Sequence, residues 1–108
     1  MENSLRAIAE PRRQEILRLI ADRELASGEI AAHFDITRPA ISQHLQVLKA
    51  AGLVSERRAG TRRLYQARPE GLAQLRDFLD HFWAGGLERL ARAAELEQRR
   101  QDLGNERR

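Results

Sequence analysis

The chain has 108 residues, of which 42% are hydrophobic and 32% charged, a balance typical of a charge-rich globular protein. No apolar run approaches the roughly 18 residues that span a membrane, and the N-terminus lacks the basic-then-apolar pattern of a secretory signal. We therefore expect a cytoplasmic protein with no membrane partner. Because the chain has no cysteine, disulfides and thiolate chemistry are excluded.

The net charge of +3 is unevenly distributed along the chain. Residues 1–36 and 69–108 are each slightly acidic, whereas residues 37–68 carry six arginines and Lys49 against Glu56 alone. A local basic stripe on a balanced chain is typical of a polyanion-binding surface. A solvated basic face without a partner would have the same charge.

The first half of the chain predicts four helices. Apolar residues at helical spacing place them at about 3–9, 11–21, 27–34 and 37–51. Ser27 and Thr37 are candidate N-caps, and Gly52 suits the position just past a helix end. Residues 22–26 are expected to form a connection. The last two helices, separated by a short turn at 35–37, predict a helix-turn-helix.

After Gly52 the apolar residues alternate, which predicts two short strands, 53–58 and 62–67, around a hairpin loop. Pro69 then opens a long helical stretch to about residue 98. Gly85-Gly86 lies inside this stretch and should weaken or kink it.

A hairpin directly after a helix-turn-helix defines the expected fold class. It is mainly α with a β-hairpin, a winged helix-turn-helix in the order α-α-α-α-β-β-α. We expect a single DNA-binding and dimerisation domain over residues 1–100 and a disordered tail at 101–108.

Helical phase within 37–51 separates a core face from a polar face. Ile41, Leu45 and Leu48 share one side of the helix. The polar side carries candidate base readers: Arg38, Ser42, Gln43 and Gln46. Arginine recognises guanine and glutamine recognises adenine in the major groove, although an ordinary polar helix face would have a similar composition.

Four arginines flank the glycine-containing loop of the predicted hairpin: Arg57, Arg58, Arg62 and Arg63. Arginines on such a wing suit DNA phosphates or a narrow minor groove. Protection of an edge strand by charge is the alternative, although it does not explain why almost all the charge is positive.

Three segments together resemble the ArsR/SmtB family of bacterial winged-helix regulators: RRQEILRLI, GEIAAHFDITRPAISQHLQVLKAAGLVSERRAGTRRLYQ and LRDFLDHFW. The resemblance covers about residues 5–95. It implies a homodimer whose two reading helices enter successive major grooves of an inverted-repeat operator. It also implies a transcription regulator, which we expect to be a repressor of double-stranded DNA targets.

The resemblance adds residue roles to this interpretation. It implies DNA contacts from Thr37, Arg38, Ser42, Gln43 and Gln46, flanked by the wing arginines. It implies a dimer interface on the first and last helices that includes Leu5, Ile8, Leu79, Phe82, Trp83, Leu87 and Leu90. The alternative for this stripe is packing within one chain.

The sequence departs from the metal-sensing pattern of that family. Where such members often carry Cys-x-Cys, this chain has Ala26, Ser27 and Gly28, and Asp80 and His81 are adjacent where others have Asp-x-His. We therefore expect no metal site and no cofactor, with the effector unidentified. A nickel- or zinc-responsive regulator, using His81 with acids across a dimer, remains an alternative.

The sequence bears on two further function classes. A winged helix can serve as a protein-interaction module, in which case its basic stripe would be dispensable. An enzyme is not expected, because no catalytic Ser-His-Asp set, paired carboxylates or phosphate-binding glycine loop occurs at usable spacing.

Overall fold

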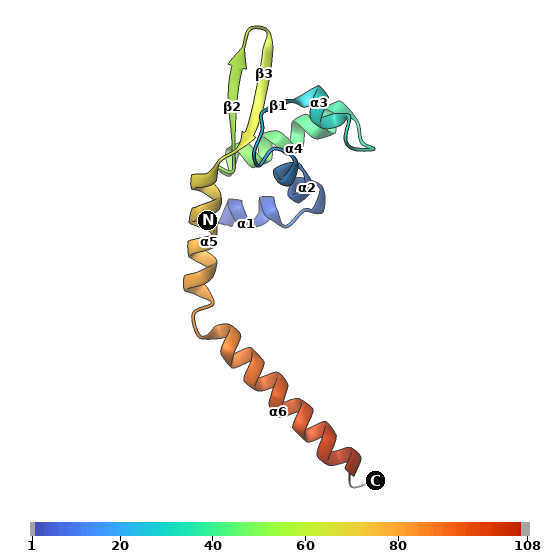
Figure 1. Cartoon of the computed structure of the whole chain (residues 1–108), viewed down its shortest axis with the longest axis vertical. Coiled ribbons are helices and arrows are strands. Elements are labelled where there is room, and N and C mark those ends of the chain that lie inside the picture. Colours follow the sequence, from blue (N-terminus) through green and yellow to red (C-terminus); the bar gives the residue numbers. More distant parts are fainter. Residues whose placement is uncertain (1, 107–108) are drawn as a thin grey trace. The chain divides into compact units, whose positions relative to one another are not determined.

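The computed structural model of the chain describes residues 2–106 and the side chains of 2–105. Two compact units make up the chain, Met1–Arg76 and Asp77–Arg108. The elements, in chain order, are α1 (Glu2–Ile8), α2 (Pro11–Leu19), β1 (Leu25–Ala26), α3 (Ser27–Ala31), α4 (Arg38–Ala50), β2 (Val54–Ala59), β3 (Arg62–Ala67), α5 (Pro69–Phe82) and α6 (Gly86–Glu106) (Figure 1). The mainly helical winged helix-turn-helix predicted from the sequence is confirmed.

The sheet has three antiparallel strands in the order β1-β3-β2, one strand more than predicted. Leu25 and Ala26, expected in a connection, pair with Tyr65 and Leu64 of β3. The β2–β3 hairpin closes through two residues rather than three, and Gly60 adopts a φ of 64° in its loop. Glycine is the residue that adopts this conformation without strain at the first position of a two-residue loop.

The core of the first unit is a single apolar cluster. Its large, fully buried side chains come from α2 and the residue that caps its end, α3, α4 and the start of the wing: Ile16, Ile20, Ile30, Ile41, Leu45, Leu48 and Leu53. Burying each such side chain contributes about 1.5–3 kcal/mol to folding. The three members from α4, the predicted reading helix, are the residues that helical phase assigned to the core. The helical phase predicted for this segment is therefore confirmed.

Both predicted boundaries of α4 are confirmed by their hydrogen bonds. The Thr37 hydroxyl accepts a hydrogen bond from the Ala40 amide at 3.3 Å, which caps the N-terminus. Gly52 has a φ of 77°, and the amides of Gly52 and Leu53 donate to carbonyls of the last turn at 3.0 Å each. This pair of bonds is a Schellman motif, which ends the helix and turns the chain into the wing.

Helix α3 differs from its prediction at both ends. Ala26, not Ser27, is the residue before the first turn, and the Glu29 carboxylate accepts a hydrogen bond from its amide at 3.0 Å. The helix ends at Ala31, and residues 32–37 form the turn that leads to α4. A glutamate at the third helical position therefore satisfies the amide of the residue that precedes the helix.

The start of α5 is anchored to the end of α4. The Arg68 amide donates to the Leu53 carbonyl at 2.8 Å, and the Arg68 guanidinium donates to the Gly52 carbonyl at 3.2 Å. A Cβ at Gly71 would overlap the same Gly52 oxygen. Only glycine therefore fits at position 71 without moving the backbone.

In the second unit, the predicted weak point at Gly85-Gly86 is a full break. Helix α5 ends at Phe82, Gly85 takes a φ of 76°, and α6 begins at Gly86. Helix α6 then continues to Glu106, into the tail expected to be disordered, whose residues 107–108 lie outside the described residues. No helix within 2–106 is both long and apolar enough to cross a membrane.

Candidate nucleic-acid interface

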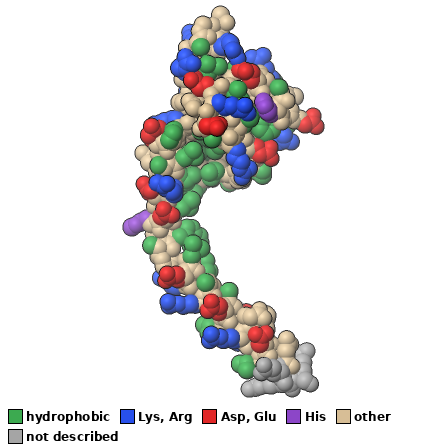
Figure 2. All heavy atoms as spheres, viewed as in Figure 1, with side chains coloured by type: hydrophobic (Ala, Val, Ile, Leu, Met, Phe, Trp, Pro, Cys, Tyr) green, Lys and Arg blue, Asp and Glu red, His purple; other side chains and the backbone are tan. Residues whose placement is uncertain are grey.

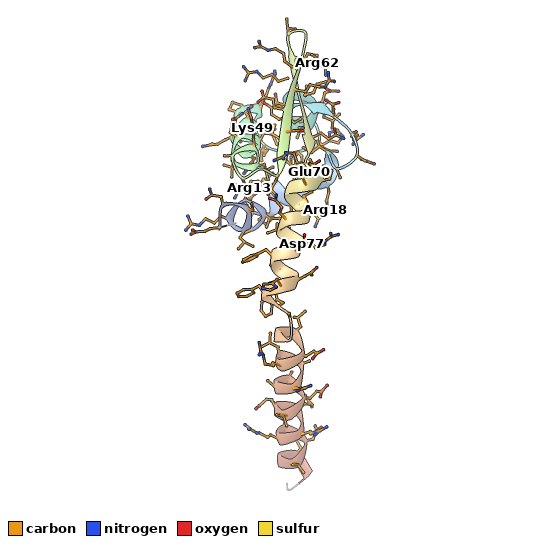
Figure 3. The ribbon with its side chains drawn as sticks, turned by 90° about the vertical axis from the view of Figure 1, so that its left-hand side faces the viewer. Arg13, Arg18, Lys49, Arg62, Glu70 and Asp77 are labelled. Carbon is orange, nitrogen blue, oxygen red and sulfur yellow. The ribbon has the colours of Figure 1, made fainter. Side chains whose placement is uncertain are left out.

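A hollow of about 620 Å³ lies between α4, the start of α3 and the wing. Five of the residues predicted to contact DNA line it: Arg38, Ser42 and Gln46 from α4, and Arg62 and Arg63 from β3. We refer to it as the wing hollow. The predicted reading helix and the predicted wing thus contribute to one continuous surface, on which Arg62 is labelled in Figure 3.

The other predicted contacts lie outside the wing hollow. Gln43 is exposed on α4, and Thr37 is exposed with its hydroxyl committed to the helix cap. Arg57 and Arg58 are exposed on β2. The predicted residues therefore form two groups, those gathered around the hollow and those on its surroundings.

Arg38 lies back against α3 instead of extending away from α4. A Cβ built on Gly28 would be 3.6 Å from the Arg38 guanidinium carbon. A methyl group at position 28 would make only ordinary van der Waals contact with this guanidinium, so the distance places Arg38 beside the start of α3.

Three of the four wing arginines form ion pairs within the chain. The Arg57 guanidinium donates to both oxygens of Glu24 at 2.8 and 3.4 Å, which raises the pKa of Arg57. Arg62 pairs with Glu29, and Arg63 lies 3.3 Å from a Glu56 oxygen. Arg58 has no ion-pair partner within residues 2–105.

The Glu56 carboxylate is shared between the end of α4 and the wing. Lys49 donates a hydrogen bond to it, and this bond, with the charge of nearby Arg63, lowers the pKa of Glu56. The neighbouring Tyr65 has a raised pKa, first because it is buried and then because the Glu56 charge disfavours a phenolate. One acid thus joins the reading helix to the middle of the hairpin.

Sequence reasoning missed Glu24 and Glu29 as members of this surface. Both belong to the acidic first third of the chain, yet the fold places them against the wing arginines. The segment 37–68 has a net charge of +6 in the sequence, but two of its arginines face carboxylates from outside it. The pairing of Leu25 and Ala26 with β3 places them there, and no local sequence pattern signals a strand of two residues.

The residues predicted for the dimer interface differ in exposure. Leu5 and Ile8 in α1 are half-buried, whereas Leu79, Phe82, Trp83, Leu87 and Leu90 are exposed. Phe78 stacks on Phe82 with ring centroids 5.8 Å apart, and Phe82 meets Trp83 edge-on at 5.5 Å. Packing within the second unit therefore leaves this part of the stripe uncovered, and Figure 2 shows exposed apolar side chains there.

No group of three or more His, Cys, Asp or Glu side chains within the described part of the chain is placed to hold a metal ion. His81 is exposed on α5 together with Asp80. The wing hollow is lined instead by cationic and neutral polar groups with Glu29. Such groups suit an anionic partner better than a metal cation.

A helix-turn-helix with arginines on its reading helix and on an adjoining wing defines a winged-helix DNA-binding regulator. The sequence profile described as "Bacterial regulatory protein, arsR family" matches residues 10–56. The HTH-type transcriptional regulator Rv2034 of Mycobacterium tuberculosis is 46% identical over 96 residues, covering 89% of this chain and 90% of the relative. The chain belongs to the ArsR family and is a transcriptional regulator, not an enzyme.

Two further comparisons agree with this assignment. The transcriptional repressor SdpR of Bacillus subtilis is 43% identical over 60 residues, covering 56% of this chain and 67% of the relative. A solved structure, the homodimeric winged helix-turn-helix DNA-binding domain of Mb0332 from Mycobacterium bovis, has a TM-score of 0.63 and 35% identity, with 82% of each chain covered.

Proposed function

We propose that this chain binds an inverted-repeat operator in double-stranded DNA as a homodimer and represses transcription from it. The observation that carries the proposal is the wing hollow, where Arg38, Ser42 and Gln46 of the reading helix face Arg62 and Arg63 of the wing. Donors and acceptors for base edges and cations for phosphates share one surface. Both kinds of contact are needed for sequence-specific binding.

The residues of the reading helix and the arginines of the wing take different tasks in this proposal. Ser42, Gln43 and Gln46, with Arg38, read base edges in the major groove, and Thr37 at the helix N-terminus lies against the phosphate backbone. The wing arginines contact phosphates beside the half-site. Arg58 is the readiest of them, because it has no carboxylate to exchange within residues 2–105.

A second copy of the chain is the partner we propose for the apolar stripe. Leu79, Phe82, Trp83, Leu87 and Leu90 are exposed in the single chain, and large exposed apolar patches typically mark interaction sites. The homodimeric state of the Mycobacterium bovis neighbour supports a dimer. We propose that residues 1–100 act together as one DNA-binding and dimerisation domain in the cytoplasm, with Leu5 and Ile8 also at the interface.

The repressing direction is supported by the name of the SdpR relative. A dimer that occupies two successive major grooves of a promoter also excludes other proteins from that DNA, which is the simplest physical route to repression. We assign no metal, cofactor or effector to the regulator.

The test is a selection of genomic fragments by the purified full-length chain at near-physiological salt. We expect an enriched inverted repeat whose half-sites are centred about one helical turn, roughly 10 base pairs, or slightly more apart. Failure to enrich any sequence would refute the proposal. It would favour a protein-interaction module, whose partner binding would survive loss of the basic surface.

Two variants divide base reading from phosphate contact. Gln43→Ala should change the preferred base at one position of each half-site, whereas Arg58→Ala should weaken binding to all sequences and reduce its salt dependence. Arg12→Ala, which removes an exposed arginine from α2, is the matched control and should leave both properties unchanged.

A further inference from the structure

Three of the four wing arginines, Arg57, Arg62 and Arg63, are already engaged with carboxylates in the chain without DNA. We propose that Glu29 acts as an internal substitute for a DNA phosphate, which holds Arg62 in the free protein and releases it on binding. The inference rests on the proposed DNA binding and goes beyond it, because it makes an acidic residue on the DNA-facing surface a determinant of affinity.

The position of the pair carries the inference. Glu29 and Arg62 both line the wing hollow, together with the α4 residues proposed to read bases. Their side chains remain 47% and 57% exposed, so solvent and a duplex can reach both. A carboxylate presents oxygens to the arginine fork much as a phosphate does, and the two anions therefore compete for one guanidinium.

The pair is weak enough to exchange. Ion pairs between exposed side chains change an equilibrium by a factor of about two to five, because water screens them and two long side chains must be ordered. Phosphate contacts gain additionally from the release of counterions condensed on DNA. A phosphate should therefore displace Glu29. Because the Glu29–Arg62 pair must break first, the affinity for DNA is lower than it would be without the Glu29 charge.

Glu29 has a second role, which a suitable substitution can leave intact. Its carboxylate also accepts the Ala26 amide hydrogen bond that begins α3. A glutamine keeps an oxygen acceptor for that amide but removes the negative charge that holds Arg62. Glu29→Gln therefore separates competition for arginine from the local structure of α3.

The other pairs of the surface are less suited to this role. Glu24 pairs with Arg57, and neither residue lines the wing hollow. Glu56 is shared between Lys49 and Arg63, and only 12% of its side chain is exposed, so it acts as a tie between α4 and the hairpin. Glu29 is thus the acid of the surface that is accessible, faces the hollow and holds a single arginine.

The experiment compares Glu29→Gln with Glu15→Gln in the full-length chain. Glu15→Gln removes the same charge from an exposed position on α2. Each variant is titrated with a random-sequence duplex of about 20 base pairs by fluorescence anisotropy at several salt concentrations. We expect Glu29→Gln to bind two- to five-fold tighter than Glu15→Gln, with the advantage shrinking as salt rises.

A double-mutant cycle with Arg62→Ala assigns the effect to the pair. Without Arg62, Glu29→Gln should have no advantage over Glu15→Gln. Thermal unfolding of each variant checks that α3 keeps its start.

Three results would overturn the inference. Equal affinities of Glu29→Gln and Glu15→Gln would show that Glu29 does not compete, and an advantage that survives Arg62→Ala would show that it does not act through Arg62. Weaker binding by a fully folded Glu29→Gln would make Glu29 a positioning residue for Arg62. In each case the wild type still binds DNA, whereas absence of salt-sensitive binding by the wild type would refute the proposed function itself.

Discussion

The two units of the chain differ in how far their apolar side chains are buried. In the first unit, Ile41, Leu45 and Leu48 of the reading helix are fully buried. In the second unit, Phe82 and Leu87 are 64% and 65% exposed. The first unit therefore contains the contacts that define its own structure, whereas the second has large apolar side chains that its own packing does not cover.

This difference separates two sources of stability. A buried core stabilises a chain at any concentration, but an exposed apolar helix face is stabilised only when a partner binds it. The first unit, which forms the reading head with α4 and the wing, should thus keep its fold in a monomer. The stripe from Leu79 to Leu90 should instead affect stability through assembly.

The largest effect is expected from Leu45→Ala. Truncating this fully buried side chain should lower the free energy of unfolding by about 3 kcal/mol, measured by chemical denaturation. Leu103→Ala, at an exposed position of α6, is the matched control and should stay within about 0.5 kcal/mol of the wild type. Similar losses in both variants would contradict the distinction between the units.

The next largest effect is expected from Gly71→Ala. The new methyl group would overlap the Gly52 carbonyl oxygen, so the unfolding free energy should fall by about 2 kcal/mol. Both variants are measured by thermal unfolding. In the control Gly104→Ala, the added methyl group on α6 meets no atom within 4 Å and should be neutral or slightly stabilising. An unchanged Gly71→Ala would mean that α5 is not seated on the end of α4.

The stripe itself is tested by Leu90→Glu. A charge at this exposed position should leave the reading head folded but weaken self-association by about tenfold or more, measured by analytical ultracentrifugation. Leu103→Glu adds the same charge to a similarly exposed leucine on the opposite face of α6 and should not change the dimer. Equal effects of the two variants would place the interface elsewhere.

The smallest effect is expected in the pH dependence of stability, through the Glu56 carboxylate that joins α4 to the hairpin. Because the folded chain lowers the pKa of Glu56 below its ordinary value of 4.5, the ionised acid stabilises the fold above that value. The benefit is lost as pH falls through the lower folded pKa. The unfolding free energy of the wild type should exceed that of Glu56→Gln by up to about 1 kcal/mol near neutral pH, and this difference should disappear once the pH lies below the lowered pKa of Glu56. A difference that persists in acid would exclude the carboxylate charge as its cause.

The parts of the fold that depend on neighbouring residues were predictable from the sequence. Helix α4 has its cap at Thr37, its terminating glycine at position 52 and its buried leucines at helical spacing, all within a single stretch of chain. The long helical segment and its break at Gly85-Gly86 could be located for the same reason.

The parts that depend on distant residues were not predictable. Strand β1 has two residues, too few for a pattern, and exists because β3 pairs with it from about forty positions away. The carboxylates at Glu24 and Glu29 lie 33 positions from the arginines that they hold. Counting charge by segment located the basic surface correctly, but it could not show that two acids from another segment lie on it.

The contact between Gly71 and Gly52 has a consequence for how such a regulator could receive a signal. The Gly52 carbonyl both follows the last turn of α4 and supports the first turn of α5, and at position 71 the contact is made by backbone. A displacement of the first turn of α5 would therefore shift the end of the reading helix directly. An effector that moved the first turn of α5 would thus alter the angle at which α4 meets the major groove in the proposed complex with DNA.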